Sequence, residues 1–370
     1  MDALNVGDLV EVEVGPVAHG GHFVARHEGR VIFVRHAITD ERALVRITED
    51  SGRFLRGDAI EVLAASPDRV DAPCRYAHAD GCGGCDFQHV ELSAQRGLKA
   101  AVVREQLQRL AGLEVPVVVE EVPGAPDGLG WRTRMQYVWL PDGRRGLRKN
   151  HSHEVVAIDD CLIAAPRAEE RQRMDPRARV EEQVRGRAFG VDAHGFWQVH
   201  PGAAEALVQA VMDGVRPRPG ESALDLYAGV GLFSAFLAEA VGSAGSVLAV
   251  ESDRRAAAHA ADNLADQGWA SVLCARVDMA LASGSLGPAE VVVLDPPRAG
   301  AKRQVVEAIA ALQPRVIAYV ACDPAALARD LAYFAQAGYG LESLRAFDLF
   351  PMTHHVECVA LLKKTGSDLR

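Results

Sequence analysis

One cysteine in the carboxyl-terminal half, Cys322, has the sequence context of a nucleophile. It follows the apolar residues 319–321 and precedes Asp323, Pro324 and a run with helical spacing. This order predicts a thiol at the carboxyl end of a strand, beside the amino-terminal end of a helix. The partial positive charge of a helix amino terminus lowers the pKa of a thiol below its free value of about 8.5. The alternative is a buried structural cysteine, the ordinary role of a lone cysteine on an apolar strand.

A glycine-containing turn predicts a site for an adenosine cofactor. Tyr227, Gly229 and Gly231 follow an apolar strand, and Glu251 ends the next strand, 20 residues after Gly231. In a doubly wound fold, a carboxylate at that place accepts hydrogen bonds from ribose hydroxyls. The third glycine of the dinucleotide fingerprint is absent, which disfavours NAD and favours S-adenosylmethionine. We expect Asp278, after the third strand, to meet the adenine.

The segment from Asp295 to Arg298, with Pro296 and Pro297 between them, closes the fourth strand of the same region. The prolines stiffen the backbone and place a carboxylate at the mouth of the expected pocket. An aromatic residue in place of Arg298 is associated with methylation of amino groups. The arginine therefore favours an acceptor that needs a different kind of activation.

Cys322 and Glu357 together suit methylation of carbon 5 of uracil, which is a poor nucleophile. A thiolate that adds to carbon 6 converts the ring to an enolate, whose carbon 5 can attack a sulfonium methyl group. A base must then remove the carbon 5 proton so that the thiol can leave. Glu357 starts the last strand and is the expected base, because burial beside a ligand raises the pKa of a carboxyl group. Taken alone, Glu357 would be a charged residue at a strand end.

Four other cysteines predict a metal centre. Cys74, Cys82 and Cys85 have the spacing C-x7-C-x2-C with glycines between the last two, and Cys161 is available as a fourth ligand. Four thiolates suit either zinc or an iron–sulfur cluster, and their spacing does not separate these metals.

The secondary structure expected to position these residues differs between the two halves of the chain. Five or so short strands at the start predict a small OB-like barrel, and strand–helix alternation from about residue 190 predicts a doubly wound, mostly parallel sheet. We expect strands at 132–140 and a solvated helix over 167–187. The expected domains are a barrel at 1–65, a cluster-bearing central domain at 66–90 and 115–188, a bridging helix at 91–114 and a catalytic domain at 189–370.

The net charge and the hydropathy of the chain limit the kinds of partner that it can bind. The net charge of −10 argues against unspecific coating of nucleic acid but not against a local basic patch. Residues 144–149 are rich in Arg and Lys, and Trp131, Tyr137 and Trp139 lie nearby; this composition fits either an RNA contact or a solvated turn. No signal peptide or membrane span is predicted, so we expect a cytoplasmic protein. We also expect it to be a monomer.

These motifs and their order along the chain resemble those of the RNA uracil-C5 methyltransferase family of the TrmA/RumA type, and the resemblance covers nearly the whole chain. The amino-terminal barrel resembles a TRAM domain, an RNA-binding module, around residues 20–34. The four cysteines resemble the family's ligands to a [4Fe–4S] cluster, with Gly83 and Gly84 in its C-G-G-C core. The resemblance therefore implies an iron–sulfur cluster rather than zinc.

The resemblance also implies roles in the catalytic half. Residues 196–198 resemble the family's F-x-Q motif, in which Gln198 contacts S-adenosylmethionine and Phe196 lies near the target base. Residues 225–231 match its cofactor loop, and residues 295–298 match its D-P-P-R motif, with Asp295 at the cofactor and Arg298 at the substrate base. Cys322 falls at the nucleophile and Glu357 at the proton acceptor.

We therefore expect a class I S-adenosylmethionine-dependent methyltransferase that modifies carbon 5 of one uridine in structured RNA. Ribosomal RNA is favoured over transfer RNA as the substrate. The alternatives are a methyltransferase of another acceptor class and a non-catalytic, metal-containing RNA-binding protein.

Overall fold

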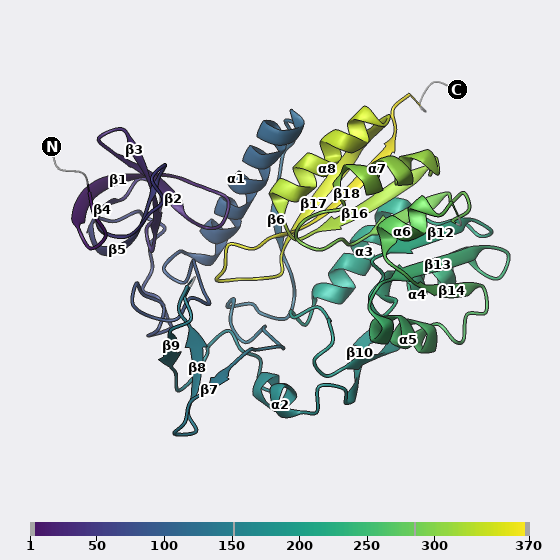
Figure 1. Cartoon of the computed structure of the whole chain (residues 1–370), viewed down its shortest axis with the longest axis horizontal. Coiled ribbons are helices and arrows are strands. Elements are labelled where there is room, and N and C mark those ends of the chain that lie inside the picture. Colours follow the sequence, from purple (N-terminus) through teal and green to yellow (C-terminus); the bar gives the residue numbers. More distant parts are fainter. Residues whose placement is uncertain (1–3, 151, 285, 367–370) are drawn as a thin grey trace. The chain divides into compact units, whose positions relative to one another are not determined.

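The computed structural model describes residues 4–150, 152–284 and 286–366, and its contacts divide the chain into two compact units (Figure 1). Unit 1 comprises Met1–Val102, Ala125–Glu169 and Phe350–His355. Unit 2 comprises Val103–Gly124, Glu170–Leu349 and Val356–Arg370. Helix α1 (Leu92–Ala111) begins in unit 1 and ends in unit 2.

Unit 1 begins with a closed five-stranded barrel, which confirms the OB-like prediction. The strands pair in the order β1-β2-β3-β5-β4, and β4 returns to β1 to close the barrel. Inward side chains alternate with outward ones, most clearly in β1, so Val10, Val12 and Val14 join Phe23 and Ile32 in the core. The strands are β1 (Leu9–Val17), β2 (Phe23–His27), β3 (Arg30–Arg35), β4 (Arg42–Asp50) and β5 (Leu55–Ala64).

The rest of unit 1 contains a small three-stranded sheet of β7 (Val138–Trp139), β8 (Arg145–Arg148) and β9 (Val155–Ala157). The strand predicted over 132–140 is reduced to the two residues of β7. Three cations of the basic segment are paired within unit 1: Arg144 with Asp142, Arg145 with Glu169 and Lys149 with Glu154. These pairs agree with the solvated-turn interpretation of that segment.

Residues 350–355 pack among residues much earlier in unit 1. The backbone N–H groups of Asp86 and Phe87 donate to the Met352 carbonyl at 2.9 and 3.0 Å. The Asp86 carboxylate accepts from His354 Nδ1 at 2.6 Å. Backbone and side-chain hydrogen bonds therefore both hold the segment directly before Glu357 in place.

Unit 2 contains an eight-stranded sheet in the order β14-β13-β12-β15-β16-β18-β17-β6. The first five strands are parallel, and β18 runs antiparallel to both β16 and β17. This is the doubly wound, mostly parallel sheet that the alternation predicts. Its strands are β6 (Val119–Glu121), β12 (Ser222–Leu226), β13 (Ser246–Glu251), β14 (Ala270–Cys274), β15 (Val291–Leu294), β16 (Val316–Ala321), β17 (Tyr339–Asp348) and β18 (Glu357–Lys364).

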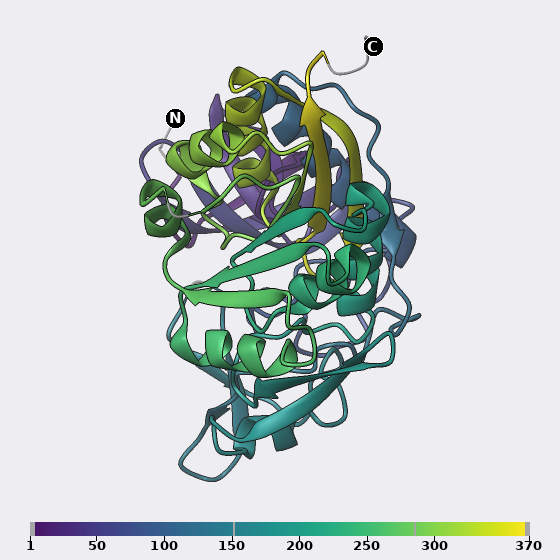
Figure 2. The same cartoon turned by 90° about the vertical axis from the view of Figure 1, so that its right-hand side faces the viewer.

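Helices flank this sheet in two packed groups (Figure 2). Helix α3 packs on α4, whereas α7 packs on both α6 and α8. Strands β12, β15, β16 and β18 are almost entirely buried, which explains their continuous apolar sequences. The helices are α3 (Ala203–Val215), α4 (Leu232–Val241), α5 (Arg254–Asn263), α6 (Val277–Ala282), α7 (Lys302–Ala311) and α8 (Pro324–Gln336).

The helix predicted over 167–187 is wrong beyond its first part. Only α2 (Ala168–Arg173) is helical, and β10 (Arg179–Val184) then pairs with β11 (Arg187–Asp192) as an antiparallel hairpin. The charges in β10 alternate with half-buried residues, so the segment has the period of a strand although it is polar.

Candidate active site

The pairing of β16 with β18 brings Cys322 and Glu357 close together. Ala321, the last residue of β16, pairs with Cys358, and Cys322 and Glu357 are the residues directly beyond this pair. The charge of Glu357 raises the pKa of Cys322, so the two side chains lie within electrostatic range of each other. Cys322 is half-buried and Glu357 is buried.

The pKa of the Cys322 thiol is raised to about 12, against the lowered value expected from the sequence. Burial is the largest cause, and the charges of Glu357 and Asp295 add to it. The expected stabilisation by the α8 amino terminus is weakened because Asp323 caps that helix itself, accepting the Ala326 N–H at 2.7 Å. The prediction failed because it considered the helix end and omitted the acidic side chains around the thiol.

Buried carboxyl groups surround the thiol. The pKa of Glu357 is raised by burial and by the charge of Asp295, while Arg298 acts in the opposite direction. The pKa of Asp295 is raised to about 7 by burial and by the charge of Asp225. The Arg298 charge also lowers the pKa of Cys322, so Cys322, Glu357, Asp295 and Arg298 lie within electrostatic range of one another.

Asp225, on β12, is a site residue to which the sequence assigned no role of its own. It is fully buried, and its pKa is raised to about 7, chiefly by burial. One oxygen accepts from the Ser234 N–H at 2.8 Å and from the Ser234 hydroxyl at 2.5 Å, while Oδ1 has no hydrogen-bond partner within the described part of the chain. Its place at the head of the cofactor-loop motif was the available signal, since an acid in an apolar strand is rarely without function.

The cofactor loop between β12 and α4 leaves room for a ligand. Gly229 and Gly231 have φ angles of 56° and 85°, and a Cβ added to Gly229 would meet no atom within 4 Å. The Gly229 N–H donates to Glu251 Oε2 at 2.9 Å, and the Asp253 N–H donates to Oε1 at 2.7 Å. The Ser252 hydroxyl also donates to Oε1, at 3.2 Å. Oε2 retains a lone pair after accepting the Gly229 bond, so Glu251 can still accept from a ribose hydroxyl. The loop therefore fits an adenosine.

Asp278 and Tyr227 lie near each other beside this loop, since the Asp278 charge contributes to the raised pKa of Tyr227, about 12. Both Asp278 oxygens accept from the Arg276 guanidinium, at 3.0 and 2.6 Å. If the Asp278 carboxylate contacts the adenine, it must do so while it also accepts from Arg276.

Phe196 and Gln198 occupy a loop between β11 and α3 in unit 2. Phe196 is 64% exposed and Gln198 is half-buried, while Trp197 packs on Phe189 with ring centroids 5.7 Å apart. Among the described residues, no hydrogen bond or ion pair joins Gln198 to the groups around Cys322. The Phe196–Gln198 loop therefore lies on its own segment. The other predicted catalytic and cofactor residues lie at or after the carboxyl ends of β12, β13, β14, β15 and β16 and at the start of β18.

The loop that carries Arg298 is held by Asp330, which sequence reasoning missed. Asp330 is fully buried on α8 and accepts from the Ala301 N–H at 2.7 Å and from the Tyr319 hydroxyl at 2.8 Å. Arg329 donates to the Ala299 carbonyl at 2.8 Å. These bonds fix the backbone directly after Arg298.

The four predicted metal-ligating cysteines come together in unit 1. Burial raises the pKa of Cys85 and raises that of Cys161 to about 11; the charge of Cys161 adds to the first shift, and the charges of Cys82 and Cys74 add to the second. The loop is tightly folded, since a Cβ on Gly83 would approach the Asn150 backbone nitrogen to 2.3 Å. Within residues 4–150, 152–284 and 286–366, no group of three metal-ligating side chains is close enough to hold a single ion.

The sheet order, the antiparallel β18 and the cofactor loop define the class of S-adenosylmethionine-dependent methyltransferases. A sequence model of the TRAM domain matches residues 3–60, and one described as tRNA (Uracil-5-)-methyltransferase matches residues 288–365. The chain is 45% identical to an uncharacterized RNA methyltransferase of Streptomyces avermitilis, covering 98% of this chain and all of that protein. A Streptomyces coelicolor protein with the same description is also 45% identical, covering 98% of this chain and 94% of its own length.

The chain therefore belongs to the RNA uracil-C5 methyltransferase family and carries an amino-terminal TRAM domain. A solved structure with the same fold is the Pyrococcus abyssi tRNA (uracil-54, C5)-methyltransferase in complex with S-adenosyl-L-homocysteine. Its TM-score is 0.71 at 22% identity, covering 95% of this chain and 100% of that one. No helix in the described part of this chain is long and apolar enough to cross a membrane.

Proposed function

We propose that the chain methylates carbon 5 of one uridine in structured RNA through a covalent bond between Cys322 and carbon 6 of the base. The observation that carries the proposal is the closeness of Cys322 and Glu357: they lie directly beyond the Ala321–Cys358 pair of β16 and β18, and the Glu357 charge raises the pKa of the thiol. A nucleophile and a buried carboxyl group close together are the two groups that this chemistry requires.

Each step assigns one task to a residue. The Cys322 thiol gives its proton to solvent, and the thiolate adds to carbon 6, so that the electron pair of the ring double bond becomes available at carbon 5. S-adenosylmethionine, when bound, would supply the electrophilic methyl group to carbon 5 and leave as S-adenosylhomocysteine. Glu357 acts in its ionised form: it accepts the carbon 5 proton, and the electron pair of that bond reforms the double bond and expels the Cys322 sulfur. The base gains a methyl group in place of the proton, and the thiolate is regenerated.

Other residues bind or orient the reactants in this proposal. Glu251 accepts from the ribose, the loop at Tyr227, Gly229 and Gly231 contacts the methionine part, and Gln198 and Asp295 complete the cofactor site. Arg298 lies within electrostatic range of both Cys322 and Glu357, so its cation can stabilise the enolate oxygen that develops during addition. Phe196 is exposed and available to stack on the flipped base.

We further propose that Cys74, Cys82, Cys85 and Cys161 hold a [4Fe–4S] cluster that orders unit 1. Their donor set is entirely soft, and N–H groups of Gly84, Ile163 and Ala164 point at the Cys82 and Cys161 sulfurs and lower their pKa values.

The RNA is proposed to be ribosomal or transfer RNA, gripped in part by the TRAM barrel. The function is tested with RNA tritiated at carbon 5 of uridine. Wild-type protein with S-adenosylmethionine should release tritium, and Cys322→Ala should release none. RNA that carries 5-fluorouridine should form a covalent complex with the wild type, because fluorine cannot leave as a proton does. Tritium release that persists in Cys322→Ala would refute the covalent mechanism.

A further inference from the structure

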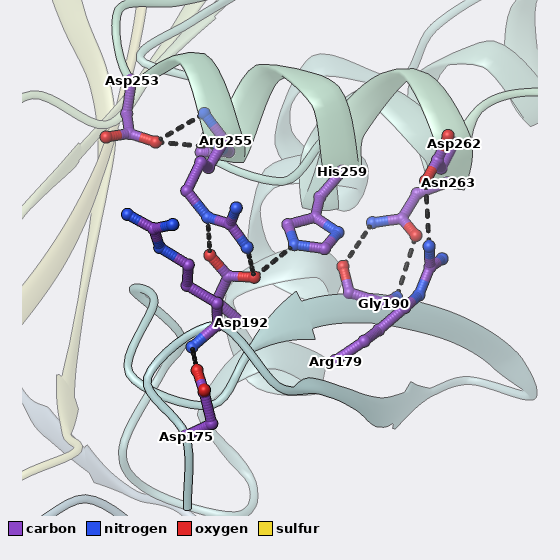
Figure 3. Close-up of polar contacts among 11 residues, drawn as sticks. Asp175, Arg179, Gly190, Asp192, Asp253, Arg255, His259, Asp262 and Asn263 are labelled. Atoms are coloured by element: carbon purple, nitrogen blue, oxygen red, sulfur yellow. Dashed lines mark hydrogen bonds and ion pairs between the residues drawn. The ribbon is translucent and has the colours of Figure 1, made fainter.

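One face of α5 carries three polar residues at a spacing of four, Arg255, His259 and Asn263, and all three bind β11 (Figure 3). This spacing places them in a row along the helix. In the ranges that the structure describes, β10 is the only strand that pairs with β11, so the other edge of β11 can receive side chains of α5. Helix α5 directly follows Glu251, and β11 directly precedes the loop of Phe196 and Gln198.

Asn263 joins three backbone segments. Its Oδ1 accepts from the Gly190 N–H at 2.8 Å, and its Nδ2 donates to the Gly190 carbonyl at 3.1 Å. The amide thus bonds β11 as a neighbouring strand would. The same Nδ2 donates to the Val230 carbonyl at 3.0 Å, inside the cofactor loop between Gly229 and Gly231. Asn263 is only 8% exposed, so water does not readily replace these bonds.

Asp192 fixes the end of β11 on the same helix. Its carboxylate accepts from Arg255 Nη2 at 2.6 Å and from His259 Nε2 at 2.8 Å. The Arg255 fork binds both oxygens, a geometry that holds orientation as well as charge. The pKa of Asp192 is held well below its usual range, chiefly by the hydrogen bond from Arg255. The strand therefore cannot shift along α5 without breaking these bonds.

We propose that Asn263 is a positioning residue that couples the cofactor loop to the loop of Phe196 and Gln198. Asn263 links the Val230 carbonyl to β11. Asp192 holds the end of the same strand on α5 and so fixes the backbone just before Phe196. The inference rests on the proposed function, because it assumes that both loops contact S-adenosylmethionine. It adds a residue that touches neither the cofactor nor the base and yet sets the distance between the two loops.

The test measures binding of S-adenosylhomocysteine by calorimetry, without RNA, to the full-length chain. Asn263→Ala removes all three bonds and should weaken binding roughly five- to thirty-fold, the effect of losing one or two kcal/mol. The matched control is Asp262→Ala, one residue earlier on α5. Asp262 binds Arg179 of the same hairpin at 2.9 Å, but this exposed pair makes no bond to the cofactor loop. The control should bind S-adenosylhomocysteine as the wild type does.

A second variant keeps the test decisive if Asn263→Ala does not fold. Asn263→Asp retains the shape and the acceptor for the Gly190 N–H but loses both donated bonds. Its binding should be weak at pH 8 and recover relative to the wild type towards pH 5, because the protonated carboxyl can donate to the Val230 carbonyl. A purely structural role would lower the melting temperature and leave the affinity of the folded protein and its pH dependence unchanged.

The outcomes separate the inference from the proposed function. Equal affinities of the wild type, both Asn263 variants and the control would overturn the coupling alone. Absence of S-adenosylhomocysteine binding by the wild type would overturn both proposals. Weakened binding in the Asn263 variants, together with methylation at an atom other than carbon 5, would support the coupling and overturn the uracil assignment.

Discussion

Glu357 and Cys322 lie directly beyond the Ala321–Cys358 pair of β16 and β18, and the Glu357 charge is one cause of the raised pKa of the thiol. The Glu357 carboxylate therefore disfavours the ionised form of Cys322 in the free protein. Because the two groups lie close together, a bound uracil can be within reach of both.

Glu357→Gln should separate the two halves of the reaction. The amide keeps the size of the side chain but cannot accept the carbon 5 proton, so the methylated adduct should accumulate on Cys322. We expect a covalent protein–RNA complex on denaturing gels with ordinary uridine RNA, and turnover reduced by about 10²- to 10⁴-fold. Full turnover in this variant would assign the base to another residue.

The rate of adduct formation should rise with pH. The Cys322 pKa of about 12 means that the thiol is mainly protonated near neutrality. Well below its pKa, the thiolate fraction grows about tenfold per pH unit. Single-turnover rates between pH 6 and 9 measure this, with S-adenosylhomocysteine affinity over the same range as the control. A rate independent of pH would contradict the raised pKa of Cys322.

Asp225→Asn should remove part of the pH dependence of stability. The folded pKa of Asp225 is about 7, above its ordinary value, so the folded state binds the proton more tightly than the unfolded state does. Below about pH 4 both states are protonated; as pH rises to about 7, stability falls by up to about 1.4 kcal/mol per pH unit and then levels off.

The asparagine does not titrate and can still accept both bonds from Ser234. Urea unfolding from pH 4 to 8 should therefore show a flatter profile for Asp225→Asn. The exposed Asp213 provides the control, since Asp213→Asn should keep the wild-type slope. Identical slopes in all three proteins would show that Asp225 is not the titrating group.

Tyr319→Phe should lower the free energy of unfolding by about 1 kcal/mol, because it removes the buried hydroxyl that donates to Asp330 at 2.8 Å. Asp330 retains its other donors, so its charge stays satisfied. Denaturant unfolding measures the change, with Tyr333→Phe at a half-buried position of α8 as the control. A loss of equal size in the control would mean that the Asp330 bond contributes nothing specific.

Purified protein should be brown, absorb near 400 nm and lose colour when Cys85→Ser is introduced. Cys85 is buried, and the serine hydroxyl that replaces its thiolate is a harder and weaker ligand for iron. Removal of iron should destabilise unit 1, measured as increased proteolysis within residues 66–90. A colourless protein with stoichiometric zinc would refute the iron–sulfur assignment.

The fold class was predictable because β12, β15 and β16 are buried runs with strong strand propensity, separated by helices. Strand β17 was not predicted, because its burial follows no regular alternation. The hairpin of β10 was mistaken for a helix since its residues are mostly charged. Both errors concern strands whose periodicity is set by tertiary partners.

Within the site, the residue types were predictable and their mutual effects were not. Cys322 and Glu357 stood out from their flanking sequence, but their closeness depends on the direction of β18, which runs antiparallel to β16. The wrong direction of the Cys322 pKa has the same origin. Its acidic neighbours Asp295 and Glu357 are remote in sequence and become neighbours only through the sheet.

The packing of residues 350–355 in unit 1 constrains the order in which the chain can fold during synthesis. His354 bonds Asp86 across 268 positions of sequence, and Glu357 follows three residues later. Unit 1 therefore cannot be completed until almost all of unit 2 has left the ribosome. A contact of such long range also slows folding. The barrel can close early, but the bonds that fix the segment before Glu357 form only when the last strand is made.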